Sequence, residues 1–224
     1  MKKIILSLAV LIAPIIAAAQ DCSMYALSKV GSSTEYNQYD AKQKLTGKSS
    51  MKVIKSSPIT GGASLDAETA AYDKNGKLLS KDTLSVKCEN GVYYFDMSSY
   101  YPSKTMEGGT VEFKGDNLEI PANPVVGQTL KDGLMTVSMI MGTTTMNITV
   151  KIFNRKVEAI ESVTTPAGTF ECVKVSYDIE TKMMMVIKGK GVQWFAKDVG
   201  MVKSESYDAK GNLKGSEELA KITK

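Results

Sequence analysis

The chain has 224 residues, with 28 Lys and Arg against 24 Asp and Glu, a formal net charge of +4, and no histidine. Lysines and acids are interspersed and form no basic stripe, so we do not expect nucleic acid as a partner. The lack of histidine excludes Ser-His-Asp and Cys-His catalysis, imidazole zinc ligands and an imidazole pH switch.

The N-terminal residues, MKKIILSLAVLIAPIIAAAQ, have the layout of a secretory signal peptide. Two lysines precede an apolar run that ends in three alanines, so we expect cleavage after Ala19. A membrane anchor would need about 20 apolar residues, and this shorter run is interrupted by Pro14. Residues 1–19 are therefore predicted to be removed, and no later stretch is apolar enough for stable membrane insertion.

The residues after the cleavage site favour a soluble exported protein, periplasmic or secreted. Lipidation of Cys22 would need a small residue before it, and Asp21 occupies that position. No linker or break in composition divides the rest of the chain. We expect residues 20–224 to form a single β-rich domain.

Three cysteines in an exported chain leave at least one unpaired. Cys22 lies at the mature N-terminus, where a bridge would hold a fraying end, and Cys88 ends an alternating apolar run. We therefore predict a Cys22–Cys88 disulfide. Cys172 lies inside a strand-like run and is predicted to be a small buried apolar residue.

A seven-residue motif occurs three times, as YDAKQKL, YDKNGKL and YDAKGNL at residues 39–45, 72–78 and 207–213. Each copy stands between two alternating runs, with an aspartate that can bond the N–H groups of the turn and a glycine suited to a left-handed backbone. The first copy has Gln43 where the others have glycine. One carboxylate per copy is too few for a calcium loop, so we predict three hairpin turns.

Period-two alternation of apolar residues dominates the chain and predicts strands. Three segments that alternate, turn and alternate again are predicted hairpins: residues 82–96, 111–120 and 161–180. Helical patterns are weak and limited to residues 98–106 and 217–220. The expected fold is all-β, an antiparallel meander of roughly ten to twelve strands that forms a curved half-barrel or open barrel with few short helices.

Methionine is unusually frequent, with thirteen in the chain. Met residues share one face of two predicted strands, and they could be flexible core filler or the lining of an adaptable apolar hollow. A Cu(I) thioether site would need methionines to converge from several strands. The candidate ligand-lining residues are Met135, Val137, Met139, Met141, Met183 and Met185.

The only tryptophan, Trp194, lies in VQWFA with Val192 and Ala196 on its own side of the strand. We expect the indole ring to pack into an apolar face of the sheet, because the two flanking residues on that side are apolar.

The segments TTPAGTFECVKVSYD (164–178), VQWFAKDVGMVKSESYDAKGNL (192–213) and LEIPANPVVGQTLKDG (118–133) carry a resemblance to a known family. They resemble the exported TapB-like family of Bacteroidota-type bacteria, a domain of unknown function. The resemblance implies a cell-envelope protein related to β-rich half-barrels that are similar to periplasmic lipoprotein carriers. It supplies no catalytic residues and no cofactor.

Two hypotheses for the function follow. The first is a periplasmic, non-enzymatic binding module that holds an apolar small molecule or a lipidated partner in the Met-lined hollow. The second is an interaction or structural module of the cell envelope, packed on both faces of its sheet and without a cavity. No residue pattern indicates a catalytic site, a metal site or a cofactor.

Overall fold

The structure is a computed structural model that describes residues 25–97, 105–106 and 109–224. Within these ranges the chain forms fourteen β-strands. They are β1 (Ser33–Asp40), β2 (Leu45–Ile59), β3 (Gly62–Asp73), β4 (Leu78–Glu89), β5 (Val92–Asp96), β6 (Thr105–Met106), β7 (Gly109–Gly115), β8 (Asn117–Pro121), β9 (Gly133–Met141), β10 (Thr144–Thr165), β11 (Gly168–Lys182), β12 (Val186–Ala196), β13 (Gly200–Asp208) and β14 (Leu213–Thr223).

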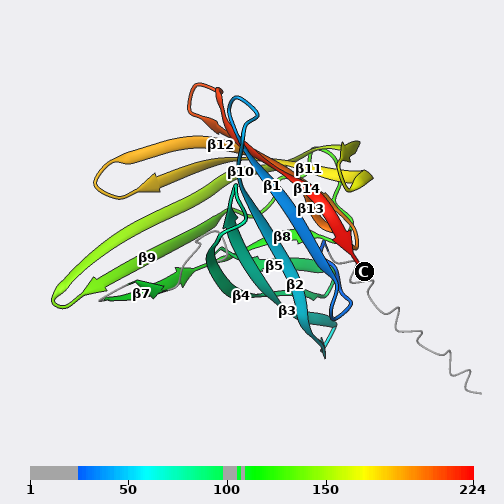
Figure 1. The fold of residues 1–224 in the computed structure, drawn as a ribbon, viewed down its shortest axis with the longest axis horizontal. Helices are drawn as coiled ribbons and strands as arrows, with labels where there is room; N and C mark the ends of the chain where they lie inside the picture. The colour runs from blue at the N-terminus through cyan, green and yellow to red at the C-terminus, as the bar shows by residue number, and fades with distance from the viewer. Residues whose placement is uncertain (1–24, 98–104, 107–108) are drawn as a thin grey trace, which may run out of the picture.

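All these strands join one antiparallel sheet that curls into a nearly closed barrel with one unsealed seam (Figure 1). The strand order is β6-β7-β9-β10-β11-β12-β13-β14-β1-β2-β3-β4-β5-β8, so the strands at the two ends of the chain, β1 and β14, lie side by side. The predicted all-β antiparallel open barrel is confirmed, with more strands than the alternation indicated.

The short helices predicted at residues 98–106 and 217–220 are wrong for the residues that the structure describes. Residues 217–220 belong to β14, whose backbone pairs with β1 on one side and with β13 on the other. The pairing on both sides outweighs the local helical propensity of Glu-Glu-Leu-Ala. Of residues 98–106, only Thr105–Met106 lie in the described ranges, and they form β6.

Two of the three predicted hairpins are present, and the third is wrong. β4 pairs with β5 and β10 pairs with β11. In residues 111–120, however, β7 pairs with β9 and β8 pairs with β5, so the two strands lie near opposite edges of the sheet. Asp116 joins them, and its carboxylate accepts a bond from the Leu134 N–H at 3.2 Å. The chain therefore crosses the seam of the barrel at this point.

The repeated motif forms three equivalent turns, as predicted. In every copy one oxygen of the aspartate accepts the N–H groups of the residues two and four positions later, at 2.8–2.9 Å. The residue three positions after the aspartate is left-handed, with φ of 60° at Gln43, 88° at Gly76 and 84° at Gly211. In each copy the tyrosine and the leucine are cross-strand partners beside a bulge. The three turns connect β1–β2, β3–β4 and β13–β14, so they lie at the same end of neighbouring strands.

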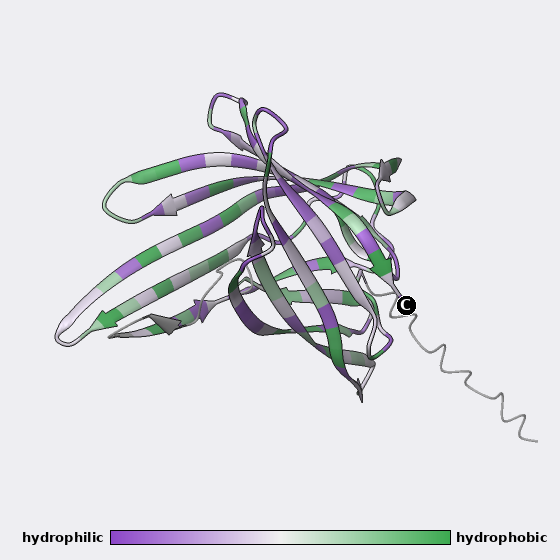
Figure 2. Ribbon diagram, viewed as in Figure 1, coloured by the Kyte–Doolittle hydropathy of each residue, from purple (hydrophilic) through white to green (hydrophobic). Residues whose placement is uncertain are grey.

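Hydrophobic and hydrophilic residues alternate along many of the strands (Figure 2), so apolar side chains share one face and form the main core inside the barrel. Its most buried members include Val53, Leu65, Cys88, Leu118, Ile120, Met135, Val137, Val157 and Val175. A second cluster is formed where β10, β11 and β12 approach β13, β14 and β1. It contains Tyr36, Cys172, Trp194, Ala196, Val199, Val202 and Leu219.

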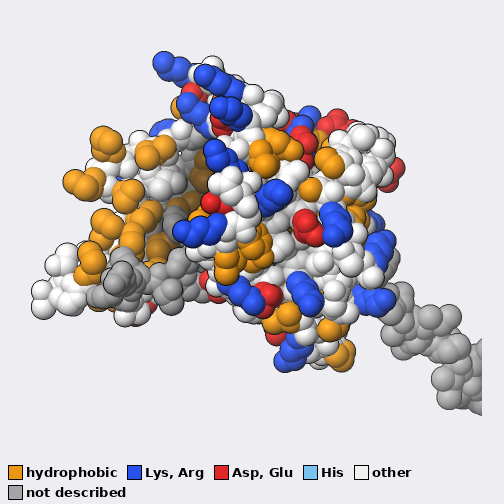
Figure 3. Space-filling view, viewed as in Figure 1, with side chains coloured by type: hydrophobic (Ala, Val, Ile, Leu, Met, Phe, Trp, Pro, Cys, Tyr) orange, Lys and Arg blue, Asp and Glu red, His pale blue; other side chains and the backbone are white. Residues whose placement is uncertain are grey.

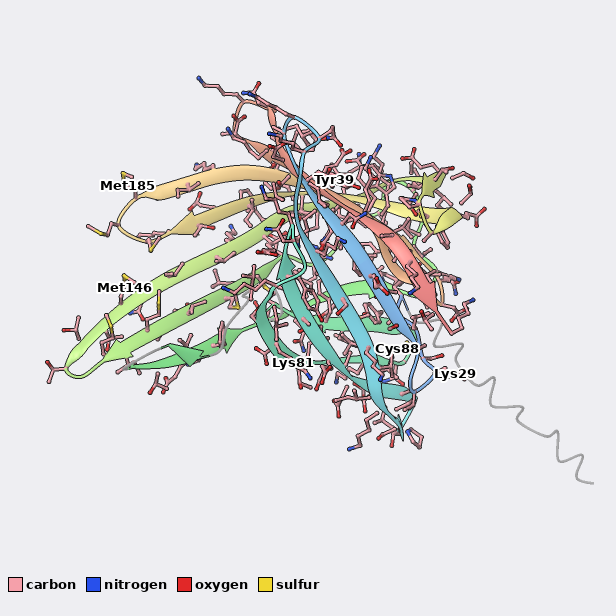
Figure 4. The ribbon with its side chains drawn as sticks, viewed as in Figure 1. Lys29, Tyr39, Lys81, Cys88, Met146 and Met185 are labelled. Atoms are coloured by element: carbon pink, nitrogen blue, oxygen red, sulfur yellow. The ribbon has the colours of Figure 1, made fainter. Side chains whose placement is uncertain are left out.

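The N-terminal segment Tyr25–Leu27 is buried against one end of the barrel. The Tyr25 ring makes edge contacts with Tyr93 and Phe195, with centroids 6.2 and 6.3 Å apart. Its hydroxyl lies 3.4 Å from the carbonyl oxygen of Ala122 and donates to it. This segment covers the end of the barrel opposite to the three repeated turns. Figure 4 places Lys29 and Cys88 at that end and Tyr39 at the other.

Two long hairpins extend beyond the barrel in the same direction, on the left of Figure 1. They are β9–β10 and β11–β12, which are joined along β10 and β11 as far as the pair Thr149 and Lys182. Beyond this pair the two hairpin ends separate.

Candidate functional site

A cavity of about 390 Å³ opens into the barrel between β1–β5 and the strands β12–β14. Its volume lies within the usual range of small-molecule sites, about 300–1,000 Å³. One part of its wall is apolar, formed by Tyr25, Leu84, Val86, Tyr93, Phe95, Phe195 and Met201. The other part is polar, formed by Gln38, Ser49, Ser50, Thr69, Ser80, Asp82, Thr83 and Glu217.

The apolar wall is held by aromatic packing. Phe95 lies 6.0 Å from Tyr93 and 6.3 Å from Phe195, measured between ring centroids, and Tyr25 contacts both of the latter rings. These rings come from the N-terminal segment, β5 and β12, which are far apart in sequence. Burial raises the pKa of Tyr25 to about 12, so its hydroxyl stays protonated near neutral pH.

The polar wall is organised around one carboxylate. One oxygen of Glu217, on β14, accepts the Ser49 hydroxyl at 2.7 Å and the Gln38 side-chain amide at 3.1 Å. Tyr36 lines the same cavity, and burial raises the pKa of its phenol well above the ordinary value. The wall therefore offers carboxylate acceptors beside protonated hydroxyl groups.

The charge of the cavity has one sign. Among the described residues that line it, Asp82 and Glu217 are the charged ones, and neither lysine nor arginine contributes. A bound polar group would therefore meet acceptors and negative charge, which favours a neutral hydrogen-bond donor or a cation.

The described part of the chain contains no cluster of three or more His, Cys, Asp or Glu side chains that could hold a metal ion. The two acids of the cavity come from β4 and β14, and the hydrogen bonds to Glu217 come from an amide and a hydroxyl.

The family model described as DUF3108-like matches residues 29–219, which include nearly all the strands of the barrel. The chain belongs to the DUF3108-like family. The match does not test the narrower resemblance to the TapB-like family or the relation to lipoprotein carriers. Both stay predictions.

Two solved structures share the fold of this DUF3108-like chain. One is a presumed exported protein with a YmcC-like fold from Bacteroides fragilis NCTC 9343, at 26% identity, a TM-score of 0.78, and coverage of 91% of this chain and 100% of that one. The other is a presumed lipoprotein from Parabacteroides distasonis ATCC 8503, at 24% identity with the same TM-score and coverage. No curated protein matches the chain. In the described ranges, no helix has the length and apolar character needed to cross a bilayer.

The six residues predicted to line a ligand hollow divide between the main core and the hairpin ends of this DUF3108-like barrel, and none lines the larger cavity. Met135 and Val137 are buried in the main core, and Met139 is half-buried against it. Met141 lies exposed at the end of β9, while Met183 and Met185 lie exposed at the β11–β12 turn. The larger cavity has a different lining, in which the methionines are Met51 and Met201.

Met135 does contact a smaller cavity of about 190 Å³ beside the seam. The remaining lining comes from Met97, Phe113, Gly115, Asp116 and Asn117. A Cβ on Gly115 would overlap the backbone of Leu134 and Met135, so a side chain at this position would press directly on β9. This small space is part of the chain crossing and lies apart from the larger cavity.

The lining of the larger cavity was missed by the sequence reasoning, although it left a signal. On β2, β3 and β4 the inward apolar positions give way to Ser49, Thr69 and Asp82. Polar residues at positions that continue an apolar alternation indicate an internal space that contains water or a ligand.

Trp194 is packed as predicted and is only 7% exposed. Its indole N–H donates to Glu161 at 2.8 Å, and the ammonium groups of Lys174 and Lys203 lie 5.2 and 5.6 Å from the ring centroid. These contacts join β10, β11, β12 and β13. The residue belongs to the second cluster and does not line the cavity.

The two described cysteines of this DUF3108-like chain belong to different apolar clusters. Cys172 is a free and fully buried thiol whose pKa burial raises to about 11, which confirms its predicted apolar role. Cys88 is fully buried in the main core at the end of β4. Cys22 lies outside the described residues, so the Cys22–Cys88 bridge stays a prediction.

Proposed function

We propose that the protein is an exported, periplasmic and non-enzymatic binding protein whose barrel holds one small amphipathic ligand. The observation that carries the proposal is the cavity of about 390 Å³, which has an apolar aromatic wall and a polar wall within one space. A fully packed sheet, as in the alternative of a structural module, would leave no such space. The names of the two structural relatives, an exported protein and a lipoprotein, support export.

The lining limits the chemistry of the ligand. Its apolar part would pack against Phe95, Phe195 and Met201, and its polar group would face Glu217 and Asp82. A fatty-acid carboxylate placed there would be repelled by two negative charges in a partly buried space, where screening is weak. The ligand we propose therefore has a neutral hydroxyl-bearing or cationic polar group.

Native mass spectrometry of protein purified gently from its own cell envelope tests the proposal. We expect an added mass of a small amphipathic compound on the wild type. The Ala71→Trp variant should lose this mass, because Ala71 lines the cavity and a large ring there would fill it. The matched control is Lys48→Trp, an exposed position opposite Tyr72 on the neighbouring strand, which should retain the ligand.

Two results would contradict the proposal. A wild type that carries no added mass, and that takes up neither a neutral nor a cationic environment-sensitive amphiphile, would refute ligand binding. Uptake that is unchanged in a well-folded Ala71→Trp variant would place the ligand elsewhere on the protein.

A further inference from the structure

The end of the β11–β12 hairpin exposes an unbroken run of large apolar side chains. The N–H of Met183 donates to the carbonyl oxygen of Met185 at 3.1 Å, so the chain reverses tightly at this point. The exposed fractions are 44% for Met183, 95% for Met184, 75% for Met185, 49% for Val186 and 60% for Ile187.

The end of the β9–β10 hairpin has the same character. No charged residue occurs from Gly133 to Val150, a stretch that includes the whole projecting part of this hairpin. Gly142, with φ of 57°, lies in the turn, and Met141 and Met146 beside it are 48% and 36% exposed. Figure 4 shows Met146 and Met185 on the two hairpins that project to the same side.

The apolar side chains of the two ends gather on one side of the molecule (Figure 3). Soluble proteins rarely expose a large contiguous apolar surface unless it contacts a membrane or a protein. Neither hairpin end lines the larger cavity, so ligand binding does not explain this surface.

Basic residues lie directly behind the apolar end of the β11–β12 hairpin. Lys182 and Lys188 flank the apolar run, and Lys190 follows two residues later; all three are exposed. Glu180 pairs with Lys188 at 3.4 Å. Within the described part of the chain, no acid is within ion-pair distance of Lys182 or Lys190. Among the described residues, Glu112, opposite Ser138, is the acid nearest in register to the other hairpin end.

Apolar ends with basic residues behind them complement a bilayer surface that carries negative charge. We propose that the ends of the two hairpins insert into an anionic phospholipid surface, with Met184 and Met185 among the acyl chains and Lys182 and Lys190 at the phosphates. Flexible, unbranched methionine side chains suit this contact because they conform to disordered lipid chains. Binding of this kind is peripheral and reversible.

Vesicle co-sedimentation tests the proposal with the full mature chain. We expect binding to vesicles of phosphatidylglycerol and phosphatidylcholine, and at least tenfold weaker binding to phosphatidylcholine alone. Met184→Asp should weaken binding to the anionic vesicles by at least about tenfold, because it places a charge at the apolar end. Met184 is almost fully exposed, so this variant should keep the melting temperature of the wild type.

Val30→Asp is the matched control. Val30 is an exposed apolar residue, 54% accessible, next to Lys29 at the opposite end of the molecule, and its substitution should leave vesicle binding unchanged. Reversal of both Lys182 and Lys190 to glutamate should weaken binding by at least about twentyfold, since each basic residue near an anionic surface contributes about fivefold.

Three results would overturn the proposal. The wild type could fail to bind anionic vesicles at low salt, or Met184→Asp and Val30→Asp could bind equally well. The third is a concentration-dependent dimer, seen by analytical ultracentrifugation and abolished by Met184→Asp, in a protein that binds no vesicles. That result would assign the hairpin ends to contact between two copies of the chain.

Discussion

Gln43 occupies a backbone conformation that the other two copies of the turn give to glycine. Its φ is 60°, against 88° at Gly76 and 84° at Gly211, while the aspartate bonds of the three turns agree within 0.1 Å. The left-handed conformation costs a residue with a Cβ about 1–2 kcal/mol. Glycine avoids this cost, although it loses about 0.5–1 kcal/mol more backbone entropy on folding. We therefore expect Gln43→Gly to stabilise the protein by about 0.5–1 kcal/mol.

The reciprocal substitutions Gly76→Gln and Gly211→Gln should destabilise by a similar amount, because they place a Cβ in the same conformation. For a domain of this size, 1 kcal/mol changes the melting temperature by about 2–4 °C, which calorimetry resolves. Gln43→Ala is the control: it removes the exposed side chain but keeps the backbone strain, and it should leave stability nearly unchanged. A Gln43→Gly variant that melts below the wild type would refute the strain argument.

Two further predictions follow from the turns and the N-terminal segment. The Asn212 side-chain amide, with N–H groups of the turn, lowers the pKa of Asp208 from 3.8 to about 2. Because its folded pKa lies below the unfolded one, Asp208 stabilises the protein above about pH 4 and loses this effect as the pH falls to about 2. Urea denaturation should therefore show that the Asp208→Asn variant is less stable than the wild type at pH 7 and equally stable near pH 2. Non-reducing peptide mapping should recover Cys22 linked to Cys88 across a loop of about 66 residues, a bridge that stabilises by about 4 kcal/mol in the chain-entropy model. A Cys172 disulfide would contradict this pairing.

The geometry around the N-terminus supports that bridge. Tyr25 contacts Tyr93, and Tyr93 is the cross-strand partner of Cys88. Two residues separate Cys22 from Tyr25, so three Cα–Cα steps span up to about 10 Å when the chain is extended. Cys22 therefore lies close enough in the chain to Tyr25 to reach the buried Cys88 at the end of β4.

Local features of the fold were predictable from the sequence because they depend on neighbouring residues. The turn at Asp73 follows from its own aspartate and glycine, and the hairpins β4–β5 and β10–β11 follow from alternation on both sides of a short loop. The β7–β8 prediction failed because Gly115-Asp116-Asn117 has turn chemistry in a chain crossing as well. Local residues specify that the chain bends there, but the partners of each strand depend on β5 and β9.

The site was harder to predict for a related reason. Alternation places Met135 and Met139 on one face of β9, but it does not tell whether that face meets a packed layer or a space. The space is lined by residues from strands that are distant in the chain, such as Gln38 on β1 and Glu217 on β14, which are 179 positions apart. Pairing of β14 with β1 and of β1 with β2 brings Glu217 next to Gln38 and Ser49.

The repeated turns lie close to part of the polar wall of the cavity, since Gln38 and Ser80 line it and stand near two of the turns. In each copy the carbonyl oxygen of the tyrosine lies close to a glycine of the neighbouring strand. A Cβ on Gly215 would lie 2.9 Å from the Tyr39 oxygen, one on Gly47 would lie 3.0 Å from that of Tyr72, and one on Gly189 would lie 2.7 Å from that of Tyr207.

This close packing holds neighbouring strands together at the turn end, where Gln38 and Ala71 each stand two residues before the aspartate of a turn. The aromatic wall with Tyr25 lies toward the opposite end. A ligand would therefore place its polar group at the turn end and its apolar part toward Tyr25.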